Sequence, residues 1–471
     1  MATILNKKEI RFGTDGWRAK IAEDFTYDNV RKVAWSLGQI LLKDPAHPCV
    51  FVGFDRRFCS DQFAHEAAGV LAGLGVPTYL AQTVLPTPAF SYLAKKHKSY
   101  ALVVTASHNP PRDNGLKIKN PDGASASPTF TNQVENLIVS APENFIRAKC
   151  LREEGFKKEY MDYLKFLARG IDKKLKGKKV VIDYLHGSSA GLLEEIIGSQ
   201  HVIALRSAND PYFGGIAPEP VEKNMKELQA KVKQSKAILG VALDGDGDRI
   251  AVVDEKGNYM APTTVFPVYA YYYALALKQK GEIVQGVSLG FLGELIAQKA
   301  GLPFCWVPVG FKNIAQRMKS TSVLLGGEES GGYALGELLP DRDGLVNTLI
   351  MLKILTELKL KPSQLVAKIF KEFGPSHYER FDHHISEPVD SKHFTALCKE
   401  ALVPRIQARG LKTVHQLEID GLKLFFDDGS WLLLRPSGTE ALIRVYAETS
   451  NKNDTKELIA LASGWIKETI S

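Results

Sequence analysis

Short apolar runs alternate with longer segments of helical hydrophobic spacing through the first three quarters of the chain. The apolar runs predict buried strands and the spaced segments predict amphipathic helices. Three such strand and helix pairs are Phe51–Asp55 with Asp61–Leu74, Lys179–Asp183 with Gly191–Ile197, and Val284–Leu289 with Leu292–Ala300. Alternation of this kind predicts layered α/β domains.

The last hundred residues follow a different pattern. A helix is predicted from about Lys392 to Ala408 and another from about Thr455 to Ile470. Between them lie two apolar strands joined at Asp428-Gly429, a favourable hairpin turn, and then a third strand. This order predicts a separate, smaller α+β domain with an antiparallel sheet.

Three polar or turn-forming stretches interrupt the pattern, at residues 143–154, 255–258 and 373–375. They predict four domains, at residues 1–145, 146–257, 258–374 and 375–471. One loop rich in chemically active residues falls in each domain.

The first loop follows the apolar run that begins at Tyr100 and reads Ser107-His108-Asn109-Pro110. A hydroxyl at a strand end beside polar neighbours is a candidate nucleophile or phosphoryl carrier. The alternative is an ordinary turn serine. A second serine pattern, G-x-S-x-G at residues 187–191, matches a hydrolase motif, but helix capping by Ser188 or Ser189 explains it better.

The second loop places Asp244, Asp246 and Asp248 alternately with glycines between two strand-like runs. Three carboxylates this close repel one another without a cation, and hard oxygen ligands suit Mg²⁺ or Ca²⁺. An EF-hand requires Gly where this chain has Arg249, and it requires flanking helices. An acidic surface turn explains the glycines but not the apolar flanks.

Two further loops are suited to a sugar phosphate. The segment G-G-E-E-S-G-G at residues 326–332 offers carboxylates and a hydroxyl to sugar hydroxyls. The segment R-P-S-G-T-E at residues 435–440, with Arg444 following, offers arginines and backbone N–H groups to a phosphate. Together with the serine and the metal loop, these segments predict phosphoryl transfer on a sugar phosphate.

Five motifs occur in the order found in one family: G-T-D-G-W-R at residues 13–18, T-A-S-H-N-P, D-G-D-G-D-R, G-E-E-S-G and R-P-S-G-T-E. In these the chain resembles the α-D-phosphohexomutases along nearly its whole length. The resemblance implies an α/β fold with three similar α/β/α domains and a smaller C-terminal α+β domain around a central cleft. It also implies Mg²⁺, hexose phosphates as small-molecule partners, and glucose 1,6-bisphosphate as activator or intermediate.

The resemblance also assigns residues. Ser107 is implied as the phosphoserine, and it would hold Mg²⁺ with Asp244, Asp246 and Asp248. The catalytic surroundings are implied to be Arg18, His108, Lys117 and Arg249. Substrate binding is implied for Lys312, Glu328, Ser330, Arg435, Ser437, Gly438, Thr439 and Arg444.

One departure concerns proton transfer. Some members have His at the end of the sugar loop, where this chain has Gly332. Lys117 is our candidate for the proton carrier instead, on two expectations: a turn at Gly115 that returns it toward Ser107, and a pKa lowered by a nearby cation and a dry site. The alternative is that Lys117 only neutralises phosphate charge, in which case His108 is the next candidate.

The predicted reaction interconverts a hexose 1-phosphate and a hexose 6-phosphate. Glucose is favoured because G-E-E-S and the pair Phe311-Lys312 resemble glucose-preferring members. The alternatives are phosphomannose or phosphoglucosamine interconversion, and a catalytically silent sugar-phosphate-binding protein.

Composition restricts the setting of this reaction. The net charge of +7 over 471 residues comes without a sustained basic run, so a nucleic-acid partner is not expected. Five scattered cysteines without a C-x-x-C pair favour a reducing compartment, and no long apolar run predicts a membrane span. A cytoplasmic monomer or dimer is expected.

Overall fold

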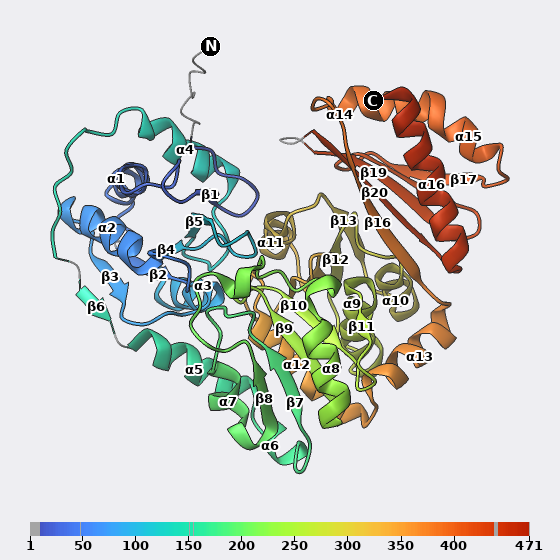
Figure 1. The fold of residues 1–471 in the computed structure, drawn as a ribbon, viewed down its shortest axis with the longest axis horizontal. Helices are drawn as coiled ribbons and strands as arrows, with labels where there is room; N and C mark the ends of the chain where they lie inside the picture. Colours follow the sequence, from blue (N-terminus) through green and yellow to red (C-terminus); the bar gives the residue numbers. More distant parts are fainter. Residues whose placement is uncertain (1–9, 48, 150, 154, 438–440, 471) are drawn as a thin grey trace. The chain divides into compact units, whose positions relative to one another are not determined.

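The computed structural model describes residues 10–47, 49–149, 151–153, 155–437 and 441–470. The chain forms two compact units. Unit 1 comprises Met1–Met260, Ala315–Ser322 and Ser330–Ser363, and unit 2 comprises Ala261–Ile314, Val323–Glu329 and Gln364–Ser471. Figure 1 follows the elements along the sequence.

Unit 1 begins with a six-stranded mixed sheet in the order β1-β5-β4-β2-β3-β6. Its strands are β1 (Trp17–Lys20), β2 (Val50–Phe54), β3 (Thr78–Ala81), β4 (Tyr100–Val104), β5 (Asp113–Lys119) and β6 (Leu151–Glu153). Its helices are α1 (Tyr27–Leu41), α2 (Ser60–Gly73), α3 (Thr87–His97) and α4 (Pro128–Ile138). Strands β2 and β4 are buried throughout and parallel, and α2 and α3 pack against them. Strand β5 turns back and runs antiparallel to both β4 and β1.

The second sheet of unit 1 has the order β11-β10-β9-β7-β8. Its strands are β7 (Val180–Asp183), β8 (Val202–Leu205), β9 (Leu239–Leu243), β10 (Ile250–Val253) and β11 (Tyr259–Met260). Its helices are α5 (Gly155–Leu167), α6 (Ile171–Lys174), α7 (Leu192–Ile197) and α8 (Lys226–Ser235), with 3₁₀ turns at Ser199–His201, Phe213–Gly215 and Glu222–Asn224. Strand β15 (Tyr333–Leu335) and helix α12 (Gly344–Leu358) complete this unit, and α12 packs on β9 and β10.

Unit 2 contains a parallel sheet in which β12 (Glu282–Gly286) lies between β13 (Phe304–Val307) and β14 (Val323–Gly327). The accompanying helices are α9 (Pro262–Ala270), a π-helical turn at Tyr271–Ala276, α10 (Leu292–Ala300), α11 (Phe311–Ser320), whose last residues belong to unit 1, and α13 (Pro362–Phe373). The layered α/β architecture predicted for the first three quarters of the chain is confirmed.

The C-terminal part of unit 2 is an antiparallel sheet in the order β16-β20-β19-β18-β17. Its elements are β16 (His377–His384), α14 (Ser391–Leu397), a π-helical turn at Cys398–Leu402, α15 (Val403–Gln407), β17 (Thr413–Leu417), β18 (Leu422–Phe426), β19 (Trp431–Pro436), β20 (Leu442–Thr449) and α16 (Lys452–Thr469). The sheet buries Leu424, Leu434 and Val445 against Ile459 and Trp465 of α16. The predicted α+β class is confirmed.

Two expectations for this region need correction. The sheet has five strands where three were expected, because β16 and β17 lie at its edges and their exposed, mostly polar residues carry no apolar signal. The single helix expected from Lys392 to Ala408 is divided by the π-helical turn that precedes Pro404. Proline lacks the N–H that would continue the α-helical ladder.

Unit 2 also buries a lysine completely. The Nζ of Lys423 on β18 lies 3.7 Å from the ring centroids of both Trp306 and Trp431, and donates to the Val287 carbonyl at 2.8 Å. Burial lowers the pKa of Lys423 to about 7, against the opposing charges of Glu448 and Glu294. The lysine therefore joins the C-terminal sheet to the residues that follow β12.

Among the described residues, no helix has the length and apolar character needed to cross a membrane.

Candidate active site

Ser107 lies in the loop between β4 and β5, and it is fully buried. Its φ of +53° is in the left-handed region, which is strained for a residue with a side chain. Its Oγ donates to Asp244 Oδ2 at 2.9 Å and lies 3.2 Å from His108 Nδ1. The structure thus brings the serine loop to the metal loop, 137 positions away.

The three carboxylates of the metal loop lie between β9 and β10, within 4.8 Å of one another and buried. The two strands form an antiparallel hairpin with Leu243 opposite Ile250, so an EF-hand is excluded by its missing helices. A Cβ on Gly245 would lie 2.5 Å from the Ser107 carbonyl oxygen. Glycine at 245 is therefore what lets the two loops touch.

The donor set fits a hard divalent cation. Asp246 Oδ1 and Asp248 Oδ1 are buried and have no hydrogen-bond partner among the residues that the structure describes. Burial, together with the charges of Asp248 and Asp246, raises the pKa of Asp244 well above its usual value of 3.8. Buried carboxylate oxygens that have no hydrogen-bond partner, and whose negative charges repel one another, are suited to Mg²⁺, which takes oxygen ligands.

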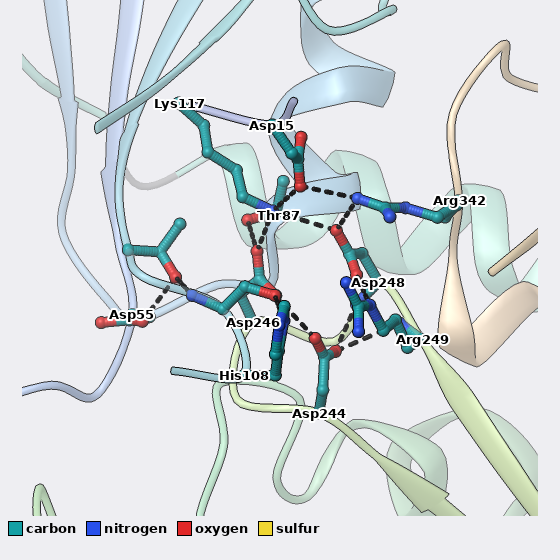
Figure 2. A network of polar contacts seen from close by, with 12 residues as sticks. Asp15, Asp55, Thr87, His108, Lys117, Asp244, Asp246, Asp248, Arg249 and Arg342 are labelled. Carbon is teal, nitrogen blue, oxygen red and sulfur yellow. Dashed lines mark hydrogen bonds and ion pairs between the residues drawn. The ribbon is translucent and has the colours of Figure 1, made fainter. Parts of the chain in front are cut away.

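Lys117 on β5 reaches into the same cluster (Figure 2). Its Nζ lies 2.6 Å from Asp15 Oδ2, 2.8 Å from Asp246 Oδ2 and 3.0 Å from Asp248 Oδ2. Burial alone would lower the pKa of Lys117, but the three carboxylates outweigh it and raise the pKa above its usual 10.5. The prediction that the pKa of Lys117 is lowered is therefore wrong, because the neighbouring carboxylates raise it.

The expected turn at Gly115 is also wrong. Gly115 lies within strand β5, opposite Arg18 of β1, and a Cβ there would lie 2.4 Å from the Trp17 carbonyl oxygen. Lys117 reaches the acidic loop because strand β5 itself runs back beside β4, with Lys117 opposite Val103.

Three further cationic or ionisable groups border the cluster. Arg18 donates to Asn109 Oδ1 at 2.8 Å, and its guanidinium lies 3.8 Å from Asp15. The Nε of Arg249 lies 3.9 Å from Asp248 Oδ1. Burial and the charges of Arg249 and Arg18 lower the pKa of His108 well below 6.5, which favours the neutral imidazole. All the catalytic residues suggested by the sequence thus lie in one part of unit 1.

The structure adds Asp15, Thr87 and Arg342 to this group. Arg342 Nη2 lies 2.6 Å from Asp15 Oδ2 and 2.7 Å from Asp248 Oδ2, and the Thr87 hydroxyl donates to Asp246 at 2.6 Å (Figure 2). Burial opposes ionisation of Asp15, yet Lys117 and Arg342 hold its pKa well below 3.8. For Arg342, the available signal was the run P-D-R-D-G at 340–344, a charged triplet directly before a mostly apolar helix.

Gly332 has a structural reason in the same place. A Cβ at position 332 would lie 2.2 Å from Cδ of Arg342, which is part of a side chain fixed by two carboxylates. The absence of a side chain at 332 and the presence of Arg342 are therefore coupled in this chain.

Most predicted substrate-binding residues belong to unit 2. Glu328 accepts from the Gly310 backbone N–H at 2.9 Å, and Lys312 lies in the first turn of α11. Arg435 pairs with Asp420 and faces Arg444 across β19 and β20. Ser437 is buried, whereas Gly438 and Thr439 lie outside the described residues.

Ser330 belongs to unit 1, and its assignment to the sugar stays a prediction, as do the other substrate contacts. The capping role expected for Ser188 or Ser189 is wrong. Helix α7 is capped by Gly191 without a side-chain bond, and both hydroxyls lack a partner among the described residues. The Ser188 N–H instead donates to the Gly245 carbonyl and supports the metal loop.

The chain is similar to known proteins along nearly its whole length. The alpha/beta/alpha domains I, II and III of phosphoglucomutase/phosphomannomutase match residues 9–144, 158–257 and 263–373, and the C-terminal domain of that family matches residues 395–461. A phosphoglucomutase/phosphomannomutase of Thermococcus kodakarensis is 28% identical, with 98% of this chain and 99% of the relative covered. A phosphoglucosamine/phosphogalactosamine mutase of Sulfurisphaera tokodaii is 30% identical, with 95% and 97% covered.

A solved structure agrees with these relatives. The crystal structure described as a phosphomannomutase from Thermus thermophilus is 27% identical and superimposes with a TM-score of 0.85, covering 98% of this chain and 100% of that one. The relatives carry different sugar names, so they agree on the enzyme class and differ on the sugar. The chain belongs to the phosphoglucomutase/phosphomannomutase family of the α-D-phosphohexomutases, which are mutase enzymes.

Proposed function

We propose that this protein interconverts a hexose 1-phosphate and a hexose 6-phosphate through a phosphoserine at Ser107. The observation that carries the proposal is the hydrogen bond from Ser107 Oγ to Asp244, within a cluster of three carboxylates that has two unpartnered oxygens. A serine in this position can carry a phosphoryl group whose charge a divalent cation offsets.

In the proposed reaction, the P–O bond to Ser107 breaks as a sugar hydroxyl forms a new P–O bond; the sugar hydroxyl gives up its proton, and the released Ser107 Oγ takes one up. The sugar then carries two phosphates as glucose 1,6-bisphosphate, and the second transfer returns the other phosphate to Ser107. Asp244, Asp246, Asp248 and the phosphorylated Ser107 would hold Mg²⁺, which when bound neutralises charge on the transferring phosphoryl oxygens.

The side chains of unit 1 supply the rest of the charge. Arg18, Lys117 and Arg249 border the serine loop as cations, and we assign them to the transferring phosphoryl oxygens. His108 lies within 3.2 Å of Ser107 Oγ and is our first candidate for the proton, since the carboxylates hold Lys117 in its charged form.

We propose glucose as the preferred sugar, with Lys312, Glu328 and Ser330 on the sugar and Arg435, Ser437, Gly438, Thr439 and Arg444 on the distal phosphate. An aminosugar is the first alternative, because the Sulfurisphaera tokodaii relative is named a phosphoglucosamine/phosphogalactosamine mutase. Mannose phosphates are the third possibility, given the name of the Thermococcus kodakarensis relative.

A coupled assay with the 1-phosphates or 6-phosphates of glucose, mannose, glucosamine and galactosamine tests this proposal. We expect the highest kcat/KM with glucose, and a discrimination of roughly 1–3 kcal/mol against the 2-epimer. Higher kcat/KM with glucosamine 6-phosphate would reverse the ranking. No turnover of any of the four would leave the silent sugar-phosphate-binding protein as the better description.

Ser107→Ala tests the phosphoserine. We expect it to remove essentially all turnover and the phosphate adduct seen by intact-mass measurement, with the unfolding temperature preserved. A fully active alanine variant would refute the proposal.

A further inference from the structure

Arg57 contributes no group to the carboxylate cluster, yet its side chain is bound to several carbonyls of the serine loop at once. It is fully buried just beyond the end of β2. Nη1 donates to the carbonyls of Pro110 and Asp113 at 2.8 and 2.9 Å, and Nη2 donates to those of Ser107 and Asn109 at 2.6 and 2.7 Å. All four terminal N–H groups are thereby used on one seven-residue segment.

The guanidinium is itself held in place. Its Nε forms an ion pair with Asp55 Oδ2 at 3.3 Å, without a hydrogen bond among the described residues, and the Arg57 backbone N–H donates to Asp55 Oδ1 at 2.9 Å. Its Cζ lies over the ring of buried Phe213, 5.0 Å from the centroid. The ion pair and the aromatic ring therefore restrict the position of the guanidinium.

Asp55 extends the same support to the other side of Ser107. It accepts from the Thr105 hydroxyl at 2.6 Å and from the Ser60 hydroxyl at 2.7 Å, and the Thr105 oxygen accepts from the Ser107 backbone N–H at 2.9 Å. Figure 2 draws Asp55 beside the network. The N–H and the C=O of Ser107 are thus both bound by groups that converge on one buried ion pair.

We propose that Arg57, supported by Asp55, is a positioning residue for Ser107: it holds the strained loop so that the hydroxyl faces the carboxylate cluster. The left-handed φ of Ser107 is strained for a residue with a side chain and persists only where the surroundings fix it. Four carbonyls directed at one planar cation fix the peptide planes on the far side of the serine, and its Oγ is left directed at Asp244.

Lysine cannot take this role. Its three donors are tetrahedral, and one ammonium cannot reach four carbonyls arranged in the plane of a guanidinium. Arg57→Lys keeps the charge beside Asp55 and changes the geometry, so it separates positioning from charge.

This inference rests on the proposed mutase function, and its test begins with the wild-type enzyme and glucose 1-phosphate. For Arg57→Lys we expect kcat to fall on the order of 100-fold, because an error of about 1 Å in the nucleophile has that effect. KM should change less than about threefold, since the predicted sugar contacts are elsewhere in the chain. The rate at which glucose 1,6-bisphosphate restores phosphate to Ser107, followed by intact mass, should fall with kcat.

Leu37→Ala is the matched control for stability. Leu37 is a fully buried residue of α1, and its truncation lowers the unfolding temperature without touching the serine loop. We expect this variant to retain wild-type kcat at an assay temperature where it is folded. Thr105→Val, which removes the acceptor for the Ser107 N–H and the donor to Asp55 but leaves Arg57 in place, should show a smaller loss of kcat with KM again preserved.

The outcomes separate the alternatives. Arg57→Lys with more than a third of the wild-type kcat overturns the inference alone, as does a loss of kcat that Leu37→Ala reproduces at an equal drop in unfolding temperature. If Arg57→Lys does not fold, Thr105→Val decides, and an unchanged kcat in that variant overturns the inference. A wild-type enzyme without turnover on any hexose phosphate overturns the proposed function first.

Discussion

The buried carboxyl of Asp343 offers a stability test that can be worked out quantitatively. It is 3% exposed, caps helix α12 by accepting from the Val346 N–H at 3.0 Å, and accepts from the Tyr160 hydroxyl at 2.8 Å. Burial raises its pKa to about 7 against these hydrogen bonds, and nearby Asp341 adds to the rise. We predict that Asp343→Asn, which keeps the shape and the cap but removes the charge, makes the protein more stable at pH 8.

The sign follows from proton binding. A carboxyl with a pKa of 3.8 in the unfolded chain and about 7 in the folded protein binds more protons when folded, so its contribution is present at low pH and lost as pH rises through about 7. The difference of roughly 3 pKa units corresponds to about 4 kcal/mol in total, at 1.36 kcal/mol per unit. Between pH 5 and pH 8 the wild-type protein should lose about 2.5 kcal/mol that the asparagine variant does not lose.

Urea unfolding followed by circular dichroism at pH 5, 6, 7 and 8 measures this difference between the two proteins. Tyr160→Phe provides a second arm, because it removes a donor that supports the ionised carboxyl, so its cost should be larger at pH 8 than at pH 5. In the double variant Tyr160→Phe/Asp343→Asn this pH dependence should disappear. Parallel stability curves for wild type and Asp343→Asn would refute the reasoning.

Three other predictions concern charged groups. Asp246→Asn should weaken Mg²⁺ binding at least tenfold in calorimetric titration, whereas Asp254→Asn, in a turn outside the cluster, should bind as wild type does. Arg342→Met should lower kcat at least tenfold and lower the unfolding temperature, because Asp15 and Asp248 lose a buried cation; wild-type values for both would contradict its place in the site. The pKa of Lys423 is about 7 in the folded protein, below its ordinary 10.5, so the free energy of unfolding of the wild-type protein should rise by about 2 kcal/mol between pH 7 and pH 9. Lys423→Met should not show this rise. Equal pH dependence of the unfolding free energy in the two proteins would contradict the prediction.

The chemical groups of the site could be predicted from the sequence because each group lies within one short loop motif. Ser107 and the three aspartates each follow a buried strand, so their position at strand ends was predictable from apolar periodicity. The hydrogen bond between Ser107 and Asp244 was not, since it depends on how two sheets pack. The resemblance supplied that pairing.

Two failures have the same physical origin. Arg342 was missed because nothing near it in sequence indicates that its partners are Asp15 and Asp248. The pKa of Lys117 was expected to fall because a cation was considered and the surrounding carboxylates were not; their number is set by tertiary packing. The missed strands β16 and β17 differ, since exposed edge strands need no apolar pattern.

The contacts of Arg342 with Asp15 and Asp248 can form only after Arg342 has been synthesised, which sets when the site is completed during translation. Arg342 and Asp15 are 327 positions apart, and Arg342 follows Asp248 by 94 positions. At about 5–20 residues per second, a ribosome adds Arg342 roughly 5–20 seconds after the acidic loop has been synthesised. Throughout that interval Lys117, already present in the nascent chain, is a cation that can pair with Asp246 and Asp248. The site is therefore completed late in translation, after both sheets of unit 1 have been synthesised.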